Sequence, residues 1–123
     1  MTRIYATLGY IDLAAGAFEP IAMPEADMPE NRFNDGKVDE NGRYWAGSMD
    51  DGEKLATGSL YRLDGDHTLH KMDENYAITN GPAFSVDGKT LHHTDTAFCR
   101  LNSYKLILCL FDKKIYCDIY AGP

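Results

Sequence analysis

The chain has 123 residues and a formal net charge of −7, with 44% hydrophobic and 25% charged residues. This length is typical of about one domain, and the negative charge argues against a nucleic-acid partner, because phosphates attract basic surfaces. The longest apolar run, residues 106–111, is too short to span a membrane. The first ten residues lack the apolar segment of a signal peptide, so we expect a cytoplasmic protein with no membrane partner.

Short strands alternate with turn signals along the chain. Asn41-Gly42 and Asp87-Gly88 are strong hairpin signals, and residues 23–32 form a loop rich in proline and acidic residues. No window has a helical period, so the sequence predicts an all-β protein. The predicted strands, in chain order, are residues 3–12, 17–22, 36–39, 43–48, 58–63, 67–72, 81–85 and 89–94.

An internal repeat supports this prediction. An offset of 46 residues places Gly42 on Gly88 and also places Asn34 on Asn80. A period of about 40–50 residues with four short strands is typical of a β-propeller blade, and the two asparagines would then occupy equivalent positions facing the central channel. A propeller closes with about 4–8 blades, whereas this chain holds about two and a half units. The sequence therefore indicates a propeller fragment, a ring made by several copies, or a simple meander.

The last 26 residues differ from the rest. Residues 1–97 carry 8 basic and 17 acidic residues, for a net −9, whereas residues 98–123 carry 4 and 2, for +2. All three cysteines, which we expect to be reduced thiols, also lie in this segment. We predict a boundary after residue 97. The tail beyond it is a last strand pair or an atypical sequence that arises from a frameshift, a misjoined exon or an unrelated extension.

One polar segment carries a family resemblance. The sequence NRFNDGKVDENGRYWAGSMD at residues 31–50 resembles the SMP-30/gluconolactonase/LRE-like (regucalcin) family, and GSLYRLD and ITNGPAFSVDGKTLHHTDT follow in the family's order. The segment DLAAGAFEPIAMPEADMPE resembles the preceding hairpin, so the likeness covers about residues 9–97. It implies a six-bladed β-propeller, of which this chain would hold about two to two and a half blades of four-stranded antiparallel sheet. It also implies a metal-dependent hydrolase of carbohydrate metabolism that opens sugar lactones to aldonic acids.

The resemblance also implies a set of site residues. Substrate contacts fall on Arg32, Asn34 and Asp51, with Asp50 a near rival, and Asn80 would be one ligand of a divalent cation (Ca²⁺, Zn²⁺, Mn²⁺ or Mg²⁺). Arginine offers a planar fork of donors, and an asparagine offers both a donor and an acceptor. Taken without the family, Arg32 could equally pair with a surface carboxylate, and the asparagine could belong to a turn.

Two carboxylate ligands of that cation are expected from segments with no counterpart in this chain. The alternative function is therefore a catalytically inactive, truncated propeller or a small binding module. Open sheet edges tend to pair with other chains, so we also expect self-association.

Overall fold

The computed structural model describes residues 6–107 and 110–118, and only the backbone of residues 105, 107 and 110–118. This part of the chain contains strands and no helix, which confirms the all-β prediction. It accordingly has no helix that is long and apolar enough to cross a membrane. The strands are β1 (Leu8–Asp12), β2 (Ala17–Ala22), β3 (Asn31–Val38), β4 (Tyr44–Asp50), β5 (Gly58–Leu63), β6 (Leu69–Tyr76), β7 (Thr79–Phe84), β8 (Thr90–Asp95), β9 (Arg100–Ile107) and β10 (Leu110–Asp118).

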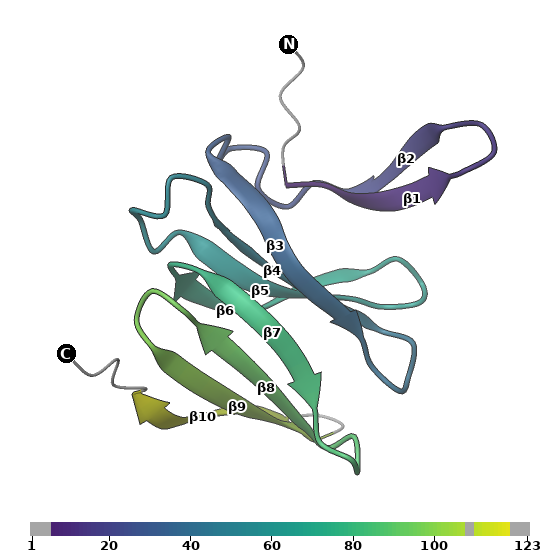
Figure 1. Ribbon diagram of the computed structural model, residues 1–123. Coiled ribbons are helices and arrows are strands. Elements are labelled where there is room, and N and C mark those ends of the chain that lie inside the picture. The colour runs from purple at the N-terminus through teal and green to yellow at the C-terminus, as the bar shows by residue number, and fades with distance from the viewer. Residues whose placement is uncertain (1–5, 108–109, 119–123) are drawn as a thin grey trace.

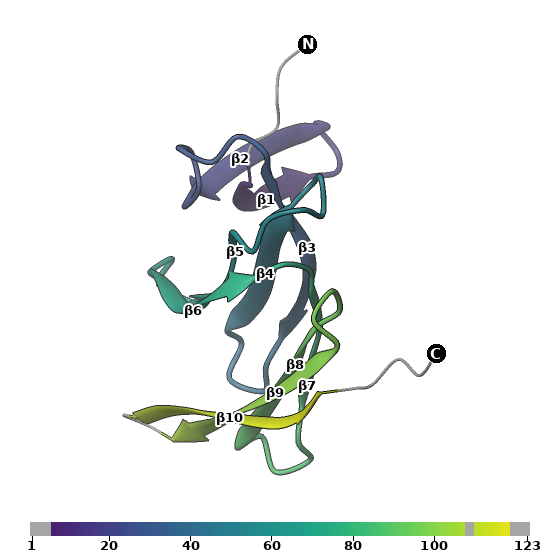
Figure 2. The ribbon, with the colours of Figure 1, turned by 90° about the vertical axis from the view of Figure 1, so that its left-hand side faces the viewer.

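The strands form three antiparallel sheets in which sequence neighbours are also spatial neighbours. They are the hairpin β1–β2, a first blade of β3 to β6 and a second blade of β7 to β10. A four-stranded meander of this kind is the unit of a β-propeller. Figures 1 and 2 show the inner strands β3 and β7 side by side, whereas the outer strands β6 and β10 lie farther apart. The two blades therefore meet along their inner strands.

The 46-residue repeat corresponds to these two blades. Gly42 and Gly88 occupy the turn after the first strand of each blade, with positive φ angles of 76° and 66° that favour glycine. β9 continues the second blade, because residues 100–105 pair with β8. The boundary after residue 97 stays a prediction, and the side chains of Cys109 and Cys117 lie outside the described residues.

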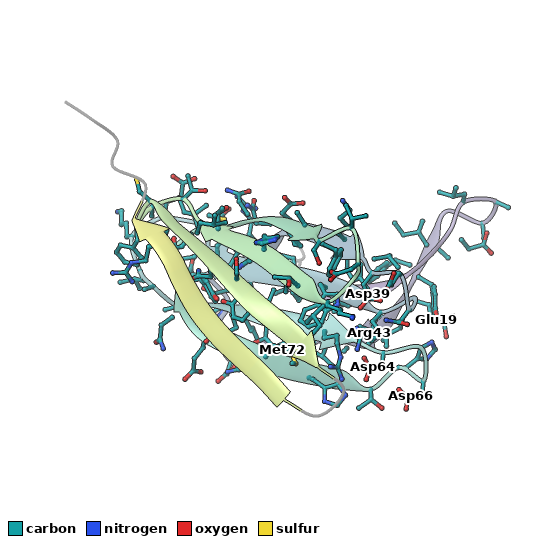
Figure 3. The ribbon with its side chains drawn as sticks, turned by 90° about the horizontal axis from the view of Figure 1, so that it is seen from below. Glu19, Asp39, Arg43, Asp64, Asp66 and Met72 are labelled. Atoms are coloured by element: carbon teal, nitrogen blue, oxygen red, sulfur yellow. The ribbon has the colours of Figure 1, made fainter. Side chains whose placement is uncertain are left out.

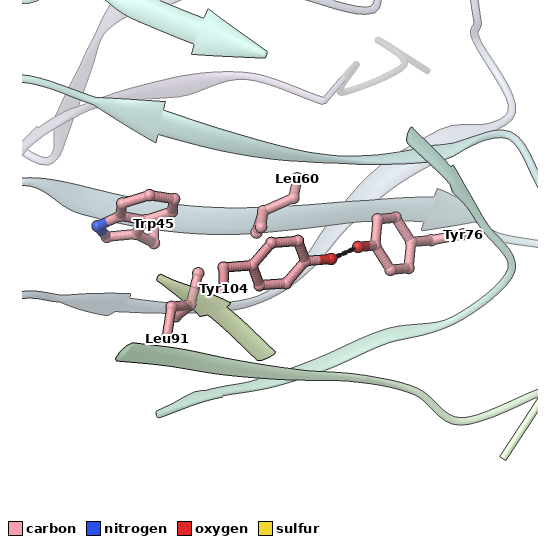
Figure 4. Packing of buried hydrophobic residues seen from close by; sticks show 5 residues of the cluster. All are labelled: Trp45, Leu60, Tyr76, Leu91 and Tyr104. Atoms are coloured by element: carbon pink, nitrogen blue, oxygen red, sulfur yellow. Dashed lines mark hydrogen bonds between the residues drawn. The ribbon is translucent and has the colours of Figure 1, made fainter. Parts of the chain in front are cut away.

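Aromatic and aliphatic side chains from both blades form one core. Trp45, Leu60 and Tyr76 come from the first blade, and Leu91 and Tyr104 come from the second (Figure 4). All five are at most 2% exposed. Trp45 and Leu91 are equivalent in the repeat, so the sequence places a large apolar group at the same position of both central strands. The blades are therefore held together mainly by burial of apolar surface.

A glycine allows the inner strand of the second blade to approach the first blade closely. A Cβ atom on Gly47 would lie 2.4 Å from the Cβ atom of Thr79, a separation that no real side chain tolerates. The Thr79 hydroxyl donates to the carbonyl oxygen of Ser48 at 3.1 Å. This close approach sets the distance between β4 and the start of β7, where the candidate site lies.

A carboxylate also ties the blades together. Asp73 Oδ2 accepts hydrogen bonds from the hydroxyl groups of Tyr76, at 2.6 Å, and Tyr104, at 2.8 Å, and the two phenol oxygens also lie in close contact (Figure 4). Burial, with the Asp73 charge adding to it, raises the pKa of both phenols above the ordinary value of 10.0. Both phenols therefore keep their protons and act as donors.

We expect Tyr104→Phe to lower the free energy of unfolding by about 1–2 kcal/mol, because it removes a buried donor to Asp73. Tyr10→Phe is the matched control, since Tyr10 is exposed and its hydroxyl bonds to His67. Urea unfolding followed by circular dichroism measures both variants, and the control should stay within about 0.5 kcal/mol of the wild type. An equal loss in the two variants would contradict this role for Tyr104.

A second carboxylate organises the turn between β3 and β4. Asp39 accepts hydrogen bonds from the backbone N–H groups of Asn41 and Arg43 at 2.9 and 3.0 Å. Its other oxygen accepts from Arg43 Nε at 2.6 Å and from Trp45 Nε1 at 2.9 Å. Burial raises the pKa of Asp39, but these hydrogen bonds together lower it below its ordinary value of 3.8. Figure 3 places Asp39 and Arg43 near the turn of β5–β6, which carries Asp64.

The pH dependence of stability follows from this lowered pKa. The charged form of Asp39 is favoured by folding, so its stabilisation is present above pH 3.8 and is lost as the pH falls through the lower folded-state pKa. We expect Asp39→Asn to lower the free energy of unfolding by roughly 1–3 kcal/mol at pH 7 and to flatten its decline below pH 4. Unfolding at a series of pH values measures this, with Glu19→Gln as an exposed control. An unchanged acid dependence would contradict the assignment.

Candidate functional site

The predicted site residues come together at one end of the two blades. Arg32 and Asn34 lie near the start of β3, Asn80 is the second residue of β7, and Asp51 directly follows β4. The Asp39 turn lies at the opposite end of the first blade. Asn34 Nδ2 donates to Asn80 Oδ1 at 3.0 Å, so two residues 46 positions apart are in direct contact across the blades.

Irregular strand pairing accounts for the direction of both asparagine side chains. In the first blade Phe33 pairs with Ser48 and Asp35 with Gly47, so Asn34 is an extra residue on β3. On β7 the register shifts between Asn80 and Ala83. Such bulges bend a strand and redirect its side chains. Here they lie close to equivalent positions, because Asn34 is within the irregular part of β3 and Asn80 directly precedes that of β7.

The hydrogen bonds of this group have a defined direction. Arg32 can only donate, and its Nη1 atom donates to Asn34 Oδ1 at 2.8 Å. Asn34 Nδ2 therefore faces the other way, where it donates to the carbonyl oxygen of Thr79 at 2.7 Å and to Asn80 Oδ1. Asn80 Nδ2 in turn donates to Thr96 Oγ1 at 2.8 Å. Both N–H bonds of Asn34 are thus engaged, which leaves its oxygen as the group available to a ligand.

The two neighbouring aspartates have different partners. Asp51 Oδ1 accepts from Arg32 Nε at 2.6 Å, with the two side chains 68% and 42% exposed. Asp50 accepts from the backbone N–H groups of Lys54 and Leu55, both at 3.0 Å, and these bonds lower its pKa. The geometry thus joins Asp51 to the site, while Asp50 orders the loop that carries Asp51. An exposed ion pair contributes little to stability, so the pairing with Asp51 serves mainly to orient the guanidinium group.

A buried carboxylate supports the start of β3. Glu25 is fully buried and accepts hydrogen bonds from Asn31 Nδ2 at 3.0 Å, Ser48 Oγ at 2.6 Å and the Tyr61 hydroxyl at 2.9 Å. Burial and the bond to Glu25 raise the pKa of Tyr61, which keeps that hydroxyl protonated. The loop after β2 is thereby fixed to β3, β4 and β5. Arg32 follows Asn31 directly, so this network also positions the guanidinium group.

Sequence reasoning missed three residues of the site. Thr79 and Thr96 accept from the two asparagines, and Asp35 Oδ2 accepts from the backbone N–H of Gly81 at 2.8 Å. Asp35 and Gly81 are separated by 46 residues, so the repeat could have identified them. The two threonines carry no such signal, because one acts through its backbone and the other follows a strand end.

The side chains at this site do not by themselves suit a divalent cation. Asn80 supplies one neutral oxygen, and the neighbouring Arg32 is a cation that would repel another. Among the described residues, no group of three histidine, cysteine, aspartate or glutamate side chains could hold a metal ion. A divalent cation needs several oxygen ligands, with carboxylates prominent among them, so this part of the chain lacks a complete donor set.

Comparison with known protein families identifies the family of this chain and the residues that match it. The family model of the SMP-30/gluconolactonase/LRE-like region matches residues 3–108. The chain belongs to the SMP-30/gluconolactonase/LRE-like family. This confirms the resemblance carried by residues 31–50, and the family match extends beyond residue 97 into β9.

Individual relatives agree with this assignment. Regucalcin from Gallus gallus is 43% identical over 81 residues, which cover 62% of this chain and 27% of that protein. The 6-deoxy-6-sulfogluconolactonase of Pseudomonas putida is 36% identical over 88 residues, which cover 72% of this chain and 30% of the relative. The chain therefore spans less than a third of the length of these relatives.

A solved structure confirms the propeller fold. The crystal structure of a calcium-binding protein, regucalcin, from Agrobacterium tumefaciens superposes with a TM-score of 0.81 at 30% identity. The match covers 90% of this chain and 39% of that structure. The two blades and the hairpin are thus part of a regucalcin-like propeller.

Proposed function

We propose that this chain supplies the sugar-lactone-binding part of a gluconolactonase-like site, whose reaction opens an aldonolactone to the aldonic acid. The observation that carries the proposal is the directed set of hydrogen bonds from Arg32 through Asn34 to Asn80 across two blades. The family and its relative named as a sulfogluconolactonase support the substrate class.

Arg32, Asn34 and Asp51 each have atoms that are available to bind the lactone. Within the described part of the chain, Arg32 Nη2 has no hydrogen-bond partner, so its two N–H groups can donate to the lactone carbonyl oxygen. When water attacks the carbonyl carbon, negative charge develops on this oxygen, and fixed donors stabilise it. Asn34 Oδ1 keeps a lone pair that can accept from a sugar hydroxyl. Asp51 holds the guanidinium plane and presents its second oxygen to another hydroxyl.

A second candidate is binding of the lactone or its acid without turnover. The observation in its favour is the small number of oxygen ligands at the site. One amide oxygen beside a guanidinium group does not hold the divalent cation that we expect the family's chemistry to use. The two candidates share the same binding residues and differ only in whether the ring is opened.

Acid release from D-glucono-1,5-lactone at neutral pH, measured with Ca²⁺, Mn²⁺, Zn²⁺ or Mg²⁺ added, tests the first candidate. We expect a metal-dependent rate above the spontaneous rate that Arg32→Ala abolishes and Lys89→Ala, on an exposed turn, retains. Calorimetric titration with D-gluconate tests the second candidate. Binding without excess hydrolysis would support it, and the absence of both would overturn the proposed function.

We also propose cytoplasmic localisation and self-association through the open edges of the blades. The outer strands β6 and β10 each lie at the end of their sheet, and an uncovered strand edge presents unpaired backbone groups to other chains. Size-exclusion chromatography with light scattering should give a mass above the monomer's 13.8 kDa. A monodisperse monomer across a tenfold concentration range would contradict self-association.

A further inference from the structure

We propose that Thr96 is a positioning residue, whose hydroxyl anchors the Asn80 amide and thereby holds Asn80 Oδ1 toward the site. This inference rests on the proposed function for its consequence in ligand binding. Its structural part rests on the hydrogen bond from Asn80 Nδ2 to Thr96 Oγ1, which measures 2.8 Å.

The two ends of the Asn80 amide have nearly the same shape and opposite hydrogen-bonding roles. Asn34 presents an N–H group to Asn80, and only an oxygen can accept it. A flipped Asn80 would set two N–H groups against each other and would break the contact between the blades. The N–H group of Asn34 thus sets the direction of the amide, and the Thr96 hydroxyl accepts from the N–H group at the other end of the amide.

The backbone of Thr96 is fixed relative to β7. Its N–H donates to the carbonyl oxygen of Ile78 at 2.9 Å. The preceding residue, Asp95, is 2% exposed and accepts from the backbone N–H groups of Ala77 and Ile78 at 3.0 and 3.1 Å. The hydroxyl therefore sits on a rigid strand end beside Asn80.

The consequence for ligands is a site that presents acceptors. Asn34 Oδ1 and Asn80 Oδ1 each accept one bond within the protein and retain a second lone pair. Adjacent hydroxyl groups of a polyol chain or sugar ring are donors that can bond to both oxygens at once. Loss of the Thr96 hydroxyl would leave Asn80 Nδ2 without this partner and would let the amide move away from the position that presents its oxygen.

The test compares Thr96→Val, which keeps the shape of the side chain, with Thr96→Ser, which keeps the hydroxyl. Thr94→Val is the matched control, because the Thr94 hydroxyl donates to the backbone carbonyl of Asn80 at 3.0 Å and leaves the side-chain amide alone. In nitrogen-15 spectra of the full chain, we expect Thr96→Val to shift the Asn80 side-chain amide signals and to accelerate their exchange with water severalfold. Thr96→Ser and Thr94→Val should leave them near the wild type.

Affinity for D-gluconate provides a second readout. We expect Thr96→Val to weaken it about three- to tenfold and Thr96→Ser to restore it. If the wild type does not bind gluconate, the proposed function fails while the amide spectra still decide the role of Thr96. Unchanged Asn80 amide signals in Thr96→Val, or equal shifts in Thr94→Val, would overturn the inference.

Discussion

Replacing Trp45 with alanine is expected to lower the free energy of unfolding by about 3–5 kcal/mol. Its side chain is fully buried at the centre of the core shared by the two blades. The indole ring packs against Phe84 of the second blade, with ring centroids 6.5 Å apart, and the guanidinium groups of Arg43 and Arg62 lie 5.9 and 5.8 Å from its centre. Urea unfolding followed by circular dichroism measures the loss.

Trp45→Phe separates the packing from the hydrogen bond. It keeps an aromatic ring and removes the Nε1 donor to Asp39, so we expect a smaller loss of about 1–2 kcal/mol. Equal losses in the two variants would mean that the hydrogen bond, and not the packing between the blades, accounts for the stabilisation.

Glu25→Ala is expected to be nearly as damaging, with a loss of about 3–5 kcal/mol. The change leaves the buried donors Asn31, Ser48 and Tyr61 without their acceptor, and each such group carries a penalty of about 1–3 kcal/mol, partly relieved by other partners. Asn31 also donates to the carbonyl oxygen of Thr57, which limits its share.

Asp27→Ala is the control for Glu25→Ala, since Asp27 lies exposed on the same loop. This control should change the free energy of unfolding by less than about 0.5 kcal/mol. Thermal unfolding of both variants gives the comparison. A small effect of Glu25→Ala would contradict a structural role for this carboxylate.

Much of the fold could be predicted because local signals agree with it. The turn at Asn41-Gly42 requires a positive φ that glycine provides, and the flanking strands follow from alternating apolar residues. The 46-residue offset then predicted that Asn34 and Asn80 would occupy equivalent positions, and the structure places them in hydrogen-bond contact. A repeated unit thus carried information on a long-range contact that no single segment contains.

Other features depend on contacts that the local sequence does not encode. The predicted loop extends to residue 32 and the next predicted strand begins at residue 36, yet Asn31 pairs with Asp50 and begins β3, because the buried Glu25 network fixes the chain there. The choice between Asp50 and Asp51 is set by which carboxylate accepts from the loop backbone. The role proposed for Thr96 depends on its hydrogen bond with Asn80, which lies on another strand.

We propose that the inner strands of the two blades present one ligand site at Arg32, Asn34 and Asn80. Titration of the nitrogen-15-labelled chain with D-gluconate, followed through the Arg32 Nε–H signal and the asparagine side-chain amides, tests it most directly. We expect saturable shifts at these three residues and unchanged signals at the Asp39 turn, at the other end of the blade. Shifts confined to that turn, or no saturable shift at the three residues, would contradict it.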